Sequence, residues 1–158
     1  MDNKLLESLP TVTVDKPVFG RITRIDNLGQ WKFMVMPLQM TTSVRASYRG
    51  SGGIGVVQSQ QFQNYSEELR IPSINFSTKY ARRDLGSYVD TFKELVKPVE
   101  GLFSPPVVAF SWGQQVFSPC VITDSSVIET DWFGNGVLAA CTMSITLLKV
   151  PQGQVVTV

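Results

Sequence analysis

The chain contains no histidine among its 158 residues. Histidine is the commonest general base, a frequent zinc or iron ligand, and half of the Ser-His and Cys-His nucleophile pairs. The glycine-rich stretch at 50–55 lacks the Lys-Ser/Thr ending of a phosphate loop, and no nucleophile elbow is present. The sequence therefore predicts neither an enzyme nor a protein that requires a metal or another cofactor.

Charge is also scarce, because only 17% of the residues are Asp, Glu, Lys or Arg and the net charge is +1. Soluble domains usually carry about 25% charged residues. A neutral chain has no global field that would steer it toward nucleic acid or acidic lipid. The small basic group formed by Arg70 and residues 79–83 is therefore predicted to be a solvated face or a salt-bridged interface. The low charge favours a β-rich subunit with much of its surface covered by other subunits.

Long apolar runs are absent, since none approaches the roughly 18 residues of a membrane-spanning helix. The N-terminus carries acidic residues and does not read as a signal peptide. We therefore expect no membrane partner and folding in the cytoplasm where the chain is made. The two cysteines, Cys120 and Cys141, lie on separate predicted strands and could face one another, but in a reducing compartment they are predicted to be buried free thiols.

Paired carboxylates are the remaining route to catalysis. Glu67 and Glu68 are neighbours in a predicted strand and would point to opposite faces, while Glu129 and Asp131 lie beside a turn. Both pairs are predicted to be solvated, because carboxylates are seldom buried. A glycan-cleaving enzyme that uses two carboxylates remains a third hypothesis.

The residues that are present predict a mainly β domain over 19–150, between an N-terminal arm at 1–18 and a short tail at 151–158. A hairpin is expected from 19–25 and 30–36, around a turn at 26–29. Residues 41–65 form a long polar segment that fits an extended hairpin with a flexible tip near 51–53. A strand follows at 67–76, with Pro72 at an edge or bulge. Apolar residues then recur at helical spacing, which predicts one amphipathic helix at 84–97.

The segment 105–151 is the most distinctive part of the chain, because it is nearly fifty residues long and holds only four ionisable charges. Strands are predicted from 107–112, 115–125 and 137–150. The last of these alternates a wholly apolar face with a small, mixed face that includes Thr142, Ser144 and Thr146. Such long, uncharged strands normally belong to a barrel or to a sheet that neighbouring copies continue.

Four aromatic residues near strand ends, Trp112, Phe117, Trp132 and Phe133, permit two interpretations. They can be core or interface anchors, or they can be platforms on which sugars stack. Packing is favoured because all four lie within or beside apolar runs. A carbohydrate-binding β-sandwich that uses Trp112 and Trp132 is nevertheless retained as an alternative function.

Several motifs resemble one family. PPVVAFSWGQQVF at 105–117 is followed by WFGNGVLAAC at 132–141 and the terminal strand TMSITLLKV. Upstream, W-x-F-x-V-x-P occurs at 31–37, and the predicted helix ends in L-V-x-P at 95–98. This order is similar to that of tail-tube-like proteins, the tube initiators or hub-to-tube adaptors in the baseplates of contractile phage tails and related injection systems. Val137 departs from the pattern, which has proline there, and the LysM module of many relatives is absent.

The resemblance implies a tail-tube-like antiparallel β-sandwich or barrel with the helix packed outside. It also implies a ring of copies, typically a homohexamer, that sits in the virion between the hub and the tail tube and lets DNA pass through its lumen. Another tail-tube-fold component, a tube or terminator protein, is the related alternative. The residues expected at subunit or ring interfaces are Trp112, Phe117, Trp132, Phe133, Thr142, Ser144, Thr146, Tyr48 and Arg49.

Overall fold

The computed structural model describes residues 8–12, 16–51, 59–101 and 103–151. Parts of the predicted arm, nearly all of the tail, and most of the predicted tip at 51–53 lie outside these ranges. The described elements are β1 (Arg21–Arg24), β2 (Gln30–Lys32), β3 (Thr41–Ser51), β4 (Ser59–Ser77), α2 (Leu85–Val96), β5 (Val108–Trp112), β6 (Gln115–Trp132) and β7 (Leu138–Lys149).

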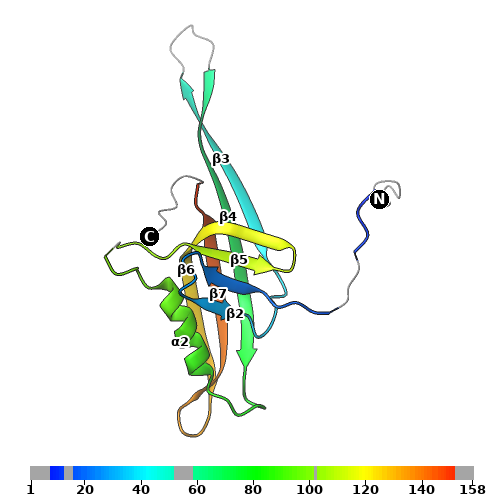
Figure 1. Cartoon of the computed structure of the whole chain (residues 1–158), viewed down its shortest axis with the longest axis vertical. Coiled ribbons are helices and arrows are strands. Elements are labelled where there is room, and N and C mark those ends of the chain that lie inside the picture. Colours follow the sequence, from blue (N-terminus) through cyan, green and yellow to red (C-terminus); the bar gives the residue numbers. More distant parts are fainter. Residues whose placement is uncertain (1–7, 13–15, 52–58, 102, 152–158) are drawn as a thin grey trace.

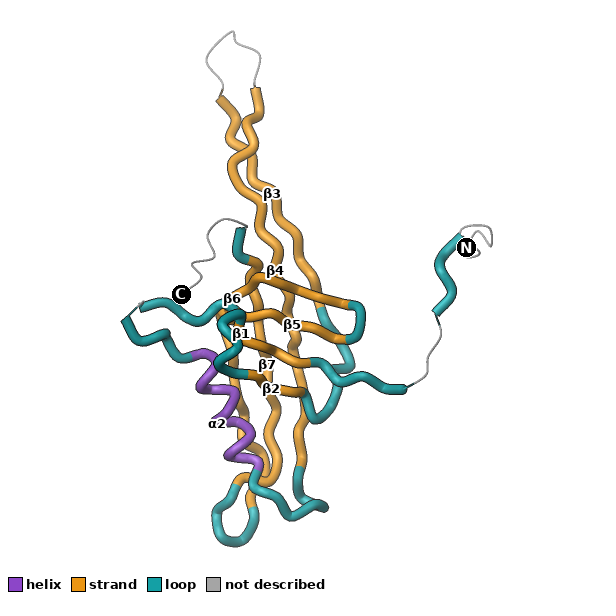
Figure 2. The backbone as a smooth tube through the Cα atoms, in the orientation of Figure 1, coloured by secondary structure: helices purple, strands orange, loops and turns teal. Residues whose placement is uncertain are grey.

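The seven described strands form one antiparallel sheet in the order β2-β1-β5-β6-β7-β4-β3. The long strands β6, β7, β4 and β3 run along the length of the molecule, and the short strands β5, β1 and β2 cross in front of them with α2 (Figures 1 and 2). The predicted mainly β fold with one helix is therefore confirmed. The single chain is not a closed barrel, because the sheet begins at β2 and ends at β3.

The core lies between the long strands and the layer made by the short strands and the helix. Trp31 on β2 is only 2% exposed, and its ring lies 6.0 Å from that of Phe76 on β4 and 5.0 Å from that of Phe92 on α2. No polar or charged residue is buried among those that the structure describes. Apolar burial is therefore the main force that holds the two layers together. The largest buried side chains are Trp31, Phe76, Phe92, Phe110, Ile22, Ile71, Ile74, Leu85, Met143, Ile145, Leu147 and Val89.

The helix begins where the sequence supplies a cap and ends before a proline. Asp84 is the N-cap, and its Oδ1 accepts a hydrogen bond of 2.8 Å from the backbone N–H of Gly86. Pro98 disfavours the helical conformation of Lys97, which is extended. The helix predicted over 84–97 thus spans 85–96, and its buried residues are Leu85, Val89, Phe92 and Leu95.

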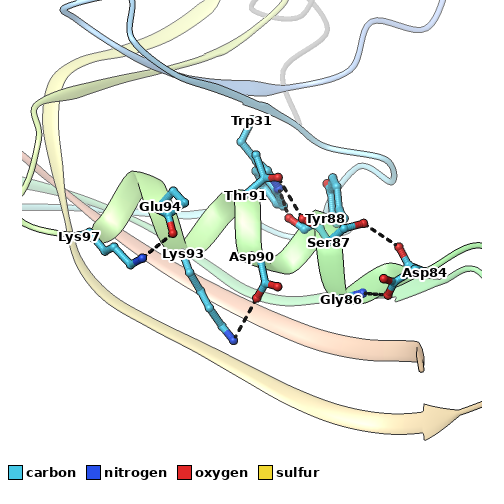
Figure 3. A network of polar contacts seen from close by, with 10 residues as sticks. All are labelled: Trp31, Asp84, Gly86, Ser87, Tyr88, Asp90, Thr91, Lys93, Glu94 and Lys97. Carbon is cyan, nitrogen blue, oxygen red and sulfur yellow. Dashed lines mark hydrogen bonds and ion pairs between the residues drawn. The ribbon is translucent and has the colours of Figure 1, made fainter. Parts of the chain in front are cut away.

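Two side chains fasten the helix to the hairpin of β1 and β2 (Figure 3). The indole Nε1 of Trp31 donates to the backbone carbonyl of Tyr88 at 3.2 Å. The phenol of Tyr88 donates in return to the carbonyl of Lys32 at 2.7 Å and accepts from the N–H of Met34 at 3.1 Å. Burial raises the pKa of Tyr88 above its usual range, so the phenol stays a neutral donor.

The pairing of β4 with β7 contains one register shift. Ile71 and Ile74 of β4 pair with Ile145 and Met143 of β7, and the register shifts between these two pairs. Pro72 lies inside this shift, as predicted, because a proline cannot donate to a ladder and is tolerated at a bulge.

The two cysteines are free and buried, as predicted, but they do not face one another. Strand register places Cys120 opposite Lys149 and Cys141 opposite Glu129. The expectation that the two cysteines could face one another is therefore wrong. Cys120 on β6 and Cys141 on β7 lie on neighbouring strands, but at different positions along them. Burial raises the pKa of Cys120 to about 12 and also raises that of Cys141.

We expect neither thiol to react with 5,5′-dithiobis(2-nitrobenzoate) at pH 8 in the folded protein. The thiolate is the nucleophile, and both raised pKa values keep Cys120 and Cys141 protonated. Both should react rapidly in guanidinium chloride, where they are exposed. Rapid reaction of either thiol in native buffer would contradict the burial seen here.

Candidate subunit interface

One side of the long strands carries mostly polar residues, and we call the following set the open face: Asp124, Ser126 and Ile128 of β6, Thr142, Ser144 and Thr146 of β7, and Arg70 and Asn75 of β4. Residues paired across antiparallel strands share a side of the sheet. Alternation along β7 turns Met143, Ile145 and Leu147 toward the core and their neighbours toward this face.

Hydroxyl groups on the open face are tied together across strands. Ser126 and Ser144 share a hydrogen bond of 2.6 Å between their Oγ atoms. The Oγ1 of Thr142 donates to Oδ1 of Asn75 at 2.8 Å. The predicted residues Thr142, Ser144 and Thr146 are all half-buried on this one surface, which the structure therefore brings together.

The row of the open face that runs through Thr146 carries two opposite charges. Thr146 pairs with Asp124 on one side and with Arg70 on the other, so the row contains one acid and one base. The sequence grouped Arg70 with the basic cluster at 79–83, but the structure separates them, because Arg70 lies in the middle of β4 and the cluster follows its end. The open face therefore presents hydroxyls without a net charge in this row.

The distal part of the β3–β4 hairpin, Val44–Gly50 with Phe62–Glu67, projects beyond the rest of the molecule (Figure 1), and we call it the projecting hairpin. Tyr48 and Phe62 are paired across its strands and are 59% and 58% exposed, with ring centroids 5.7 Å apart. Val44 and Tyr65 are also more than half exposed. Large apolar groups in such a position commonly mark a surface that a partner covers.

Sequence reasoning selected Tyr48 and Arg49 on this hairpin but missed the aromatic partners on the returning strand. Phe62 and Tyr65 stand in a stretch rich in Gln and Asn, which the sequence reading treated as polar. Aligning the two strands of the hairpin in antiparallel register would have identified them, because Phe62 then lies opposite Tyr48 and Tyr65 lies opposite Ala46.

Among the unpaired strand edges of the described sheet, two long ones flank the open face. β3 is the last strand of the sheet, and all eleven of its residues pair only with β4. β6 pairs with β5 only between Gln115 and Cys120, so in the described structure its second half has no strand on that side. Proteins usually shorten, charge or cover such edges, because the free N–H and C=O groups recruit other strands.

The four predicted aromatic residues do not form one cluster. Trp112 stands at the start of the β5–β6 turn, where its Nε1 donates to the carbonyl of Val18 at 2.8 Å, and Phe117 is buried. Trp132 ends the 18-residue strand β6 and is 50% exposed, with Phe133 beside it. Trp112 pairs with Gln115 at the start of β6 and Trp132 is the last residue of that strand, so the two tryptophans lie at opposite ends of β6 and do not form a shared sugar platform.

The described residues contain no cluster of three or more Asp, Glu or Cys side chains arranged to hold a metal ion. No helix in the described part of the chain is long and apolar enough to cross a membrane.

No family model matches the sequence, and no curated protein matches it. Among solved structures, the chain is similar to a chain in a cryo-EM structure of the anti-feeding prophage (AFP) baseplate, 6-fold symmetrised. The similarity covers 88% of this chain and 92% of that chain, with 13% sequence identity and a TM-score of 0.33.

Proposed function

We propose that this chain is a structural virion protein, a ring-forming tube-fold component of a baseplate that joins the hub to the tail tube. It belongs to a contractile phage tail or a related injection system. Its proposed role is structural: the copies assemble into a ring that encloses a channel, and the protein catalyses no reaction. The observation that carries the proposal is the pair of different unpaired strand edges that flank the open face.

These edges suit a head-to-tail interface between identical copies. The β3 edge of one copy would pair with the second half of β6 in the next, so each copy uses two different surfaces. Repetition of this contact by a constant rotation closes a ring and covers both of these edges in every copy. A homohexamer, as the motif resemblance implies, would join the long strands of all copies into one inner wall.

The open face would line the lumen of that ring. Binding to DNA depends mainly on Lys and Arg side chains that neutralise phosphates. In the row through Thr146, the charge of Arg70 is offset by Asp124, and the rows through Thr142 and Ser144 hold hydroxyl, amide and apolar groups. Such a surface would let DNA pass without holding it.

The projecting hairpin would contact a neighbouring copy or the next ring. Its exposed Tyr48 and Phe62 give a rigid aromatic pair of the kind that anchors protein interfaces. The partners would be further copies of the chain, the tail tube and the hub, which are assembled in the host cytoplasm into the virion.

The test is the oligomeric state of the protein and of one edge variant. Ile128 is 61% exposed on the unpaired half of β6, so Ile128→Lys should leave the monomer folded. A lysine there should block strand pairing with the next copy, as charges do on natural edge strands. Light scattering coupled to size exclusion should give about six times the mass of one 17.5 kDa chain for the wild type, and one chain for the variant.

Leu28→Lys is the matched control, because Leu28 is 78% exposed in the turn between β1 and β2, away from both edges. This variant should form the same particles as the wild type, visible as rings by negative-stain electron microscopy. A wild-type protein that stays monomeric at high concentration and with its hub and tube partners present would contradict the proposal.

A further inference from the structure

A pocket of about 630 Å³ lies where the loop after β4, the start of α2 and the turn between β6 and β7 come together. These three segments meet at the lower end of the molecule in Figure 1, opposite the projecting hairpin. The open face and the strand edges do not contribute to this pocket. Its lining residues are Lys79, Arg82, Arg83, Asp84, Phe133, Gly134, Asn135 and Val137.

The charges around the pocket leave two arginines without an acidic partner. Lys79 is bound to Asp131 through a contact of 2.7 Å between Nζ and Oδ2. Asp84 is engaged at the helix start, where it accepts from Gly86. Arg82 and Arg83 are exposed and make no ion pair with another described residue.

The backbone that carries these arginines is held in place. Arg82 has a φ of 50°, in the left-handed region that side chains other than glycine seldom adopt. The Oγ1 of Thr78 donates to the carbonyl of Arg83 at 2.7 Å and approaches the carbonyl of Ala139 on β7 at 3.4 Å. A strained residue kept by its surroundings is characteristic of functional sites, where it fixes a side chain in advance.

We propose that this pocket binds a carboxylate from an acidic segment of the protein that seats against this end of the molecule. The proposal rests on the proposed function, in which one end of each ring meets a different component. The guanidinium fork matches a carboxylate in two parallel hydrogen bonds. Phe133 supplies an apolar wall for the methylene groups of an incoming glutamate.

A nucleic acid fits this site less well than an acidic peptide. Asp84 lines the pocket and Asp131 lies beside it on Lys79, so acids stand next to the arginines. A phosphodiester backbone places charges continuously along its length and would bring some of them against these acids. A single carboxylate group needs only one of the two arginines as a partner.

The test is calorimetric titration of the full-length protein with a peptide that carries one glutamate among alanines, at low ionic strength. We expect salt-sensitive binding that weakens about tenfold or more in the double variant Arg82→Gln/Arg83→Gln, because charge-assisted arginine hydrogen bonds are lost. The matched control is Lys93→Gln/Lys97→Gln, which removes the same charge from α2, where these lysines pair with Asp90 and Glu94. This control should bind the peptide as the wild type does.

Equal binding by the wild type and the arginine variant, or equal loss in both double variants, would overturn the proposal. Stronger binding of a single-stranded DNA oligonucleotide through the same two arginines would also overturn it. The arginine variant should still form rings, because Arg82 and Arg83 lie in the loop after β4 and not on β3 or β6. Absence of rings in the wild type would count against the proposed function alone. The peptide titration measures binding to a pocket within one chain, so it can be carried out on a monomer.

Discussion

Trp31→Ala is expected to lower the free energy of unfolding by about 3–5 kcal/mol, the usual cost of removing a buried aromatic side chain. The ring of Trp31 lies within 4.8 Å of those of Phe33 and Tyr88, and it also contacts Phe76 and Phe92. Its removal would leave a cavity between the two layers and would also delete the hydrogen bond to the helix. Chemical denaturation followed by circular dichroism measures the effect.

The control for this prediction is Trp132→Ala. Trp132 is 50% exposed at the end of β6, so its truncation should cost about 1 kcal/mol or less. Comparable losses in the two variants would show that Trp31 does not join the layers. Because both substitutions remove a tryptophan, fluorescence is replaced by ellipticity in this comparison.

Ile145→Asp should prevent stable folding, with a loss of about 5 kcal/mol or more, because it buries a charge without a partner. Ile145 has no solvent exposure, and it lies at the centre of β7 between β4 and β6. Soluble expression and thermal unfolding measure the outcome.

The adjacent substitution Ser144→Asp supplies the matched control. Ser144 is half-buried on the open face, where its side chain contacts Ser126 at 2.6 Å. A carboxylate there keeps water on one side and can still accept that hydrogen bond, so the loss should stay near 1 kcal/mol. Failure of both variants to fold would mean that the open face is covered in the monomer.

The sequence predicted best those features that repeat at short range. Alternation in 137–150 identified which residues of β7 face the core, and the 3.6-residue spacing with Asp84 and Pro98 identified the helix. Pro72 identified the bulge in β4. Each of these signals depends on neighbours along the chain, where backbone geometry fixes side-chain direction.

Features that depend on the register between strands far apart in the chain could not be predicted from the sequence. The levels of Cys120 and Cys141 are set by the offset of β6 against β7, and three register shifts interrupt that pairing. The pocket at the helix start unites residues from three separate segments. The chain also does not indicate that β5 covers only the first third of β6, which decides where an edge is free.

The division of β6 at Cys120 has a genetic consequence under the proposed ring assembly. Substitutions before this residue disturb pairing within the chain and should behave as recessive loss-of-function alleles, because the product does not fold. Substitutions at exposed residues after it, such as Ile128, leave a folded subunit whose β3 edge is intact. Such a subunit would join a growing ring and block the next addition, so alleles in the second half of β6 should be dominant over the wild type.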